Sequence, residues 1–154
     1  VSSVTDMSDM FRSVHDFNQD ISSWDVSSVT NMSNMFEFTA FNQPIGNWDV
    51  SNVTDMSYLF SGASVYNGVL SYWNTAKVTN MSYAFANALE YNQDLGDWNT
   101  SQVTQMDAMF SNATVFNQDL SGWCVSLIDK APTNFSTGSS IPQTSLPLWG
   151  TCPD

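Results

Sequence analysis

The chain repeats itself every 24 to 25 residues, and this periodicity limits its possible folds more than any other feature. One column of the repeat is tryptophan: Trp24, Trp48, Trp73, Trp98 and Trp123. Further columns carry valine, threonine, methionine, phenylalanine and an aromatic-asparagine pair. All eight methionines and five of the six tryptophans fall in such columns. One short repeat cannot bury its apolar side alone, so the repeats are expected to stack around one continuous core.

Two different periods within each repeat predict two elements. Val29, Met32, Met35 and Phe36 follow one another at spacings typical of one face of a helix, and this predicts a short helix. The threonine after the valine is expected to cap that helix with its hydroxyl group.

The other half of the repeat reads as a short strand. Trp24 and Val26 alternate with polar neighbours within residues 21–27, as in a strand with one buried face. The predicted fold is therefore an α/β repeat solenoid, leucine-rich-repeat-like, with one short parallel strand and one short helix per 24-25-residue repeat.

The repeat resembles a known family. The unit W-D-V-S-x-V-T-x-M-x-x-M-F, followed by F-N-Q-x-I, is similar to the BspA-like leucine-rich-repeat surface proteins. The similarity is closest to their short-repeat class, first noted in mycoplasma surface lipoproteins, and it covers residues 1 to about 123. It implies a secreted or cell-surface protein with a role in adhesion or recognition, and it implies no catalytic residues. The valine column stands where ordinary leucine-rich repeats have a ladder asparagine, so a horseshoe curvature is not expected.

The two ends of the repeat array differ. Residues 1–123 read as about five repeats, without a cap before Val1, so further repeats or a cap are expected to precede it. Residues 124–154 read as a degenerate sixth repeat and a C-terminal cap. Cys124 and Cys152 lack metal-type spacing, which favours a disulfide that pins the cap, with Trp149 as its plug. A disulfide indicates an oxidising compartment, and we expect a secreted or cell-surface location.

Composition narrows the range of partners. Fifteen acidic residues against three basic ones give a formal net charge of −12, which repels a phosphate backbone and argues against nucleic acid. The sequence has no apolar run long enough for membrane insertion. A protein or a glycan remains as the expected ligand, its identity open, and end-to-end self-association is a further expectation.

Several columns could form a site. The predicted open face of the sheet carries two polar columns, Asp25, Asp49, Asn74 and Asn99 in one and Asn47, Tyr72 and Asp97 in the other. Tyr58 and Tyr83 occupy equivalent positions and should stack as an exposed pair. A separate asparagine column is expected to form a buried amide ladder that satisfies backbone groups: Asn18, Asn42, Asn67, Asn92 and Asn117.

No cofactor is expected, although calcium between Asp25 and Asp49 is left open as a less favoured alternative to a solvated face. The sequence shows no catalytic constellation, and the single histidine, His15, has no repeated counterpart. We therefore expect a non-enzymatic module for adhesion or recognition of a protein or glycan. The alternatives are a structural spacer or self-assembling surface or filament subunit, and a glycan-binding module of a larger secreted protein.

Overall fold

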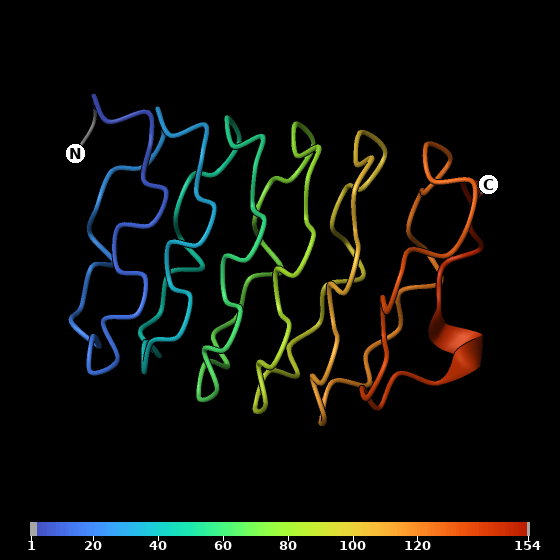
Figure 1. Cartoon of the computed structure of the whole chain (residues 1–154). Helices are drawn as coiled ribbons and strands as arrows, with labels where there is room; N and C mark the ends of the chain where they lie inside the picture. The colour runs from blue at the N-terminus through green and yellow to red at the C-terminus, as the bar shows by residue number, and fades with distance from the viewer. Residues whose placement is uncertain (1–2, 154) are drawn as a thin grey trace.

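A computed structural model of the chain describes residues 3–153 as a row of coils that lie side by side, with the two ends of the chain at opposite ends of the row (Figure 1). We number the coils from the threonine that begins each repeat: coil 1, residues 5–29; coil 2, 30–53; coil 3, 54–78; coil 4, 79–103; coil 5, 104–128; and a last, irregular coil 6, 129–153. In the described part of the chain, the one helix is the 3-10 turn η1, Gln143–Ser145.

The predicted α/β solenoid of the leucine-rich-repeat type is wrong. The segments expected to be helices are successions of turns, and the segments expected to be strands form no sheet. Among residues 3–153, parallel pairing is confined to isolated single-residue bridges along one column: Asp6, Asn31, Asp55, Asn80 and Gln105.

The physical reason lies in the three-residue spacing of the apolar side chains. A β-turn closes when the N–H of residue i+3 reaches the carbonyl of residue i. The Trp24 N–H donates in this way to the Ile21 carbonyl at 3.0 Å, and the Met35 N–H donates to the Met32 carbonyl at 3.3 Å. Consecutive turns therefore bring apolar residues inward at the same spacing as a helix, without helical bonding.

Backbone hydrogen bonds between coils replace the hydrogen bonds that the predicted helices would have formed internally. In the segment that begins each coil, alternate N–H groups donate to carbonyls of the next coil, as Met7 does to Asn31 at 2.9 Å and Phe11 does to Met35 at 3.1 Å. The threonine hydroxyl was expected from the sequence to cap a helix, and it does not. It donates to the threonine carbonyl of the previous coil, from Thr30 to Thr5 at 3.1 Å.

Two positions in each coil have a left-handed backbone. The first column comprises Asp9, Asn34, Tyr58, Tyr83, Ala108 and Asn134, and the second comprises Ser13, Phe38, Gly62, Asn87, Asn112 and Gly138. All have φ between 51° and 78°, the region that asparagine, aspartate and glycine adopt most readily. These residues stand third in their turns, where a type II turn requires a positive φ.

The core consists of stacked apolar columns. The rings of Phe36 and Phe60 lie 5.5 Å apart, and those of Phe85 and Phe110 lie 5.6 Å apart. Each indole N–H from coil 2 to coil 5 donates to a carbonyl of the preceding coil, as Trp98 does to Leu70 at 3.0 Å. The buried polar group of each tryptophan is therefore satisfied by the stacking itself.

The C-terminal end continues the stack and then closes it. Phe110 donates its N–H to the Phe135 carbonyl at 2.8 Å, so coil 6 keeps the register of the coils before it. Cys124 and Cys152 are joined by a disulfide. Trp149 packs edge-on against Phe135, with ring centroids 4.9 Å apart.

Candidate recognition surfaces

The acidic column predicted to face out from a sheet forms turns instead. Oδ1 of Asp25 accepts the N–H of Ser27 at 3.1 Å, and Asp49 accepts that of Ser51 at 3.1 Å. The asparagines of the column do the same, Asn74 to Ala76 and Asn99 to Ser101. Hydrogen bonds from the serine side chain, then from its backbone, lower the pKa of both aspartates. The regular recurrence of these carboxylates is therefore explained by the backbone N–H groups that they accept in these turns.

The asparagine column forms a ladder at the surface. Oδ1 of Asn18 accepts the N–H of Asn42 at 2.9 Å, and the same bond recurs from coil to coil as far as Asn117. Asn18 and Asn42 are exposed, so the ladder lies outside the core. The prediction of a buried ladder is therefore wrong.

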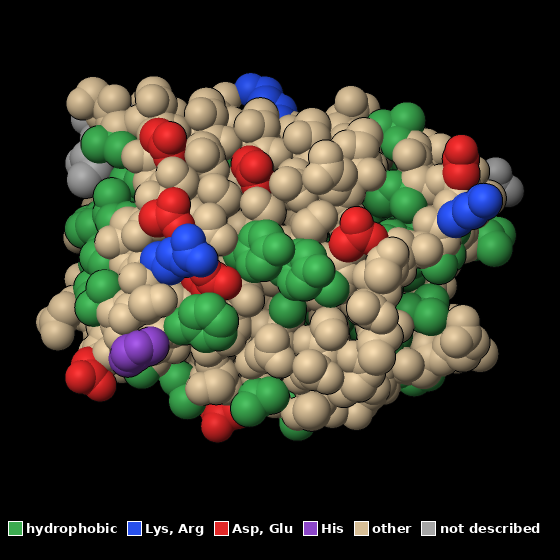
Figure 2. All heavy atoms as spheres, in the orientation of Figure 1, with side chains coloured by type: hydrophobic (Ala, Val, Ile, Leu, Met, Phe, Trp, Pro, Cys, Tyr) green, Lys and Arg blue, Asp and Glu red, His purple; other side chains and the backbone are tan. Residues whose placement is uncertain are grey.

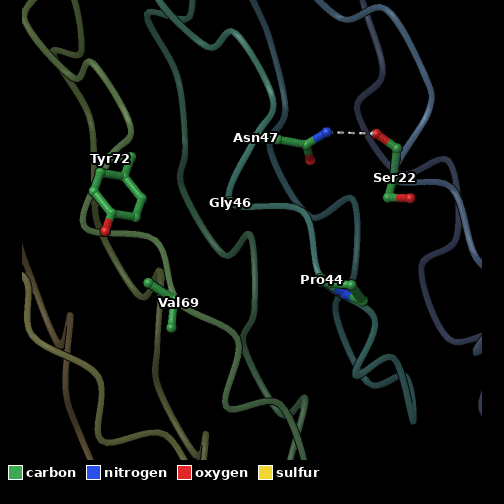
Figure 3. Close-up of a pocket in the computed structure, with 6 residues that line it drawn as sticks. All are labelled: Ser22, Pro44, Gly46, Asn47, Val69 and Tyr72. Carbon is green, nitrogen blue, oxygen red and sulfur yellow. Dashed lines mark hydrogen bonds between the residues drawn. The ribbon is translucent and has the colours of Figure 1, made fainter.

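An open groove of about 660 Å³ runs across coils 1 to 3, and Figure 3 shows the residues that line it. Two of them, Asn47 and Tyr72, belong to the predicted polar columns. The others are Ser22, Pro44, Gly46 and Val69. Tyr72 is 84% exposed, and the Asn47 amide donates to the Ser22 carbonyl at 3.2 Å. Most of the lining is apolar.

The groove forms where two coils depart from the repeat. Coils 1, 4 and 5 carry Asp20, Asp94 and Asp119 in one column, whereas coils 2 and 3 carry Pro44 and Val69 there. Gly46 brings these two coils together, because a Cβ atom at that position would lie 2.4 Å from the Val69 carbonyl oxygen. The apolar patch is thus built by substitutions in adjacent coils.

A second surface, which we call the aromatic face, comprises Phe38, Tyr58 and Tyr83. Tyr58 and Tyr83 stack with ring centroids 4.5 Å apart and an interplanar angle of 3°. The pair lies on left-handed turns and not on the predicted helix. Phe38 lies against Gly62, where a Cβ atom would approach its ring to 2.3 Å. Phe38 is 46% exposed and Tyr83 is 36% exposed.

Charged groups adjoin the aromatic face. Figure 2 shows hydrophobic side chains grouped near the middle of one side of the molecule, beside acidic and basic groups and the histidine. Arg12 Nε lies 2.7 Å from the buried carboxylate of Glu37, the residue before Phe38. The contact is an ion pair whose angles do not meet those of a hydrogen bond. The Glu37 oxygen in this contact, Oε2, has no hydrogen-bond partner within residues 3–153. Burial, with the charges of Tyr83 and Glu37 as lesser causes, raises the pKa of Tyr58.

His15 borders a smaller hollow of about 280 Å³ next to the aromatic face, together with Phe38 and Gly62. Its Nδ1 lies 2.9 Å from the Phe38 carbonyl oxygen. Coil 2 is one residue shorter than its neighbours between Phe36 and Phe41, at the rim of this hollow.

Within the described residues, no group of three or more histidine, cysteine or acidic side chains is placed to hold a metal ion. In the same part of the chain, no helix has the length and apolar character needed to cross a membrane.

Sequence reasoning missed several residues of both surfaces. Phe38 replaces the serine, glycine or asparagine of its column, and Pro44 and Val69 replace aspartate. An apolar residue in an otherwise polar column was the available signal. The sequence alone does not show which of these apolar substitutions lie next to one another in the structure.

Comparison with protein families gives a clear assignment. A profile described as "Mycoplasma protein of unknown function, DUF285" matches residues 1–69 and again residues 37–149. The chain belongs to the DUF285 family. The two overlapping matches agree with the internal repeat, because one profile fits two registers of the same array. No curated protein and no solved structure matches this DUF285 chain.

Proposed function

We propose that this DUF285 chain is a non-catalytic recognition module of a secreted or cell-surface protein, and that it binds a protein or glycan through the aromatic face. The observation that carries the proposal is the backbone of Phe38, Tyr58 and Tyr83. All three are bulky residues with φ between 56° and 60°, in columns otherwise filled mainly by small or amide side chains.

This arrangement is unfavourable for folding alone. A bulky residue in the left-handed region is strained by about 1 kcal/mol or more relative to asparagine or glycine. Such strain concentrates at ligand-binding sites, because surrounding structure holds it in place. Exposed aromatic surface also leaves apolar area in water. A binding role explains why the aromatic residues occupy these turns.

The surroundings of the aromatic face suit recognition. Tyrosine and arginine are enriched among residues that dominate binding energies, and Arg12 forms an ion pair with Glu37, the residue before Phe38. Two parallel rings with little rotamer freedom present a rigid surface.

The disulfide supports an oxidising compartment, where such bonds persist. The finer resemblance, to BspA-like surface proteins, is part of this proposal and supports adhesion as the biological setting. It does not extend to a leucine-rich-repeat fold.

The test replaces both tyrosines by the residue of coil 2. The Tyr58→Asn/Tyr83→Asn variant should lose at least about tenfold in affinity for any ligand found on a glycan and matrix-protein array, because paired aromatic anchors commonly carry 1–2 kcal/mol or more. Its stability should change by less than about 1 kcal/mol, since relief of backbone strain offsets the lost ring stacking.

Val115→Thr serves as a matched control, because Val115 is an exposed apolar residue of coil 5 away from both surfaces. This control should bind like the unmodified protein. Full binding by the double asparagine variant would remove the aromatic face as the site. Absence of any ligand on the array would instead favour the spacer or assembly role.

A second candidate is end-to-end assembly through the apolar side chains at the outer side of coil 1. Phe11, Phe17 and Trp24 are only partly buried there, unlike their counterparts in coils 2 to 5. Sedimentation over a range of concentrations tests this: assembly predicts a mass that rises with concentration, and Trp24→Gln should reduce it. A constant monomer mass would contradict it.

A further inference from the structure

We propose that the groove beside Tyr72 binds a lysine or arginine side chain presented by a partner polypeptide. This site is separate from the aromatic face, and its argument does not rest on the function proposed for that face. The groove is a break in the repeat, its lining is largely apolar, and its borders are acidic.

The shape and lining of the groove suit a long side chain with an apolar stem. Val69 and Tyr72 are 49% and 84% exposed, so their apolar surfaces are open to a ligand. Lysine and arginine cover apolar surface with their methylene groups while the charged end stays near water. The face of the Tyr72 ring can attract such a cation as well.

The acidic residues lie where the charged end would reach. Asp97 follows Tyr72 in the same column, one coil away, and Asp94 follows Val69. On the other side, Asp20 precedes Pro44 in its column and accepts the N–H of Ser22, which lines the groove. Neighbouring coils place such positions about 5 Å apart, within the range at which a carboxylate attracts a cation.

Among residues 3–153, none of the three basic side chains (Arg12, Lys77 and Lys130) lines the groove. Arg12 pairs with Asp9 and Glu37, and Lys77 donates to Asn52 at 2.6 Å. The net charge of −12 favours the approach of a cationic partner over the whole surface.

The polar groups of the groove favour a cation over a neutral glycan. A sugar presents hydroxyl groups that both donate and accept. One N–H of the Asn47 amide already donates to the Ser22 carbonyl, and the carboxylates of Asp20, Asp94 and Asp97 in the neighbouring columns only accept. Acceptors therefore predominate around an apolar floor, as an ammonium or guanidinium group requires.

The experiment is an NMR titration of the ¹⁵N-labelled protein with the peptide acetyl-Leu-Arg-Leu-Arg-amide. The expected result is a set of shift changes centred on Gly46, Val69, Tyr72 and Asp97. Tyr72→Ala should weaken binding about threefold or more, as for an exposed cation–π contact. Asp97→Asn should weaken it by about twofold to fivefold, and 0.5 M salt should reduce the affinity of the unmodified protein.

Two controls separate charge from shape and position. A peptide with citrulline in place of arginine keeps the shape and removes the charge, and should bind at least about fivefold more weakly. Leu148→Ala removes an apolar side chain that is 73% exposed from the C-terminal cap and should leave the titration unchanged. Tyr72 is exposed enough that its removal should preserve the fold, which the unbound spectrum checks directly.

Three outcomes would overturn the proposal. Equal binding of the citrulline peptide would remove the cation from the argument. Shifts that spread over the acidic surface and persist in Tyr72→Ala would show non-specific attraction. A neutral oligosaccharide that shifts the groove residues, when the arginine peptide does not, would assign the groove to a glycan.

Discussion

Two tyrosines occupy a core column in which coils 1, 2 and 5 carry phenylalanine. The hydroxyl groups of Tyr66 and Tyr91 are buried, and neither has a hydrogen-bond partner in the described structure. Burial raises the pKa of both phenols, so both are neutral throughout the physiological range. Gly68 leaves room for the Tyr66 hydroxyl, since a Cβ atom there would lie 2.5 Å from it.

Replacing Tyr91 by phenylalanine should therefore stabilise the protein. Phe17, Phe41 and Phe116 fill the same column, and loss of an unsatisfied buried hydroxyl should raise the free energy of unfolding by about 1 kcal/mol. Urea unfolding measures the change, with Phe116→Tyr as the reverse substitution, expected to destabilise by a similar amount. A loss of stability in Tyr91→Phe would mean that the hydroxyl has a partner, such as an ordered water.

At the scale of the element, side chains and backbone cooperate to form turns without helices or strands. In three columns, an aspartate or asparagine side-chain oxygen accepts the backbone N–H two residues later and so closes a turn. The members of these columns in coil 1 are Asp6, Asp20 and Asp25. Each aspartate has its pKa lowered by hydrogen bonds from the serine two residues later. Because a lowered pKa favours the folded carboxylate, its stabilisation is present above the ordinary value of 3.8 and is lost as pH falls through the lowered value.

The Asp25→Asn/Asp49→Asn variant should consequently lose less stability on acidification than the unmodified protein. Asparagine keeps the turn, as Asn74 and Asn99 do in the same column, but does not take up a proton in this range. The melting temperature measured from pH 6 to pH 2 tests this, and the difference between the two proteins should appear below about pH 4. The reverse control, Asn74→Asp/Asn99→Asp, should steepen the decline. Parallel curves for all three proteins would contradict the role given to these carboxylates.

For the whole molecule, the C-terminal end is held by both pairing and a covalent bond. The Val125 N–H donates to the Thr151 carbonyl at 2.8 Å, one residue from each cysteine of the disulfide. The bond joins residues 28 positions apart, and it closes the last coil onto coil 5. Its loss is expected to free the cap before the inner coils, because each coil contacts only its neighbours.

Replacing both cysteines by serine should lower the free energy of unfolding by about 3 to 4 kcal/mol in the chain-entropy account of a loop of this length. Hydrogen exchange should then quicken first at amides that bond to coil 6, such as those of Phe110 and Leu120. Reduction of the unmodified protein is the matched control and should give the same pattern. Uniform acceleration across all coils would show that the stack unfolds as one unit.

The sequence by itself determined the repeat length, the columns that form the core and the pairing of Cys124 with Cys152, because a stack of similar coils buries the same position each time. It could not distinguish a helix from successive turns, since Met32 and Met35 have the same spacing in both. Only the tertiary structure decided that choice, because the N–H groups that a helix would bond internally bond to the next coil. It also decided the groove and the aromatic face, because residues such as Pro44 and Val69 are far apart in the chain and meet only when coils of slightly different sequence lie side by side.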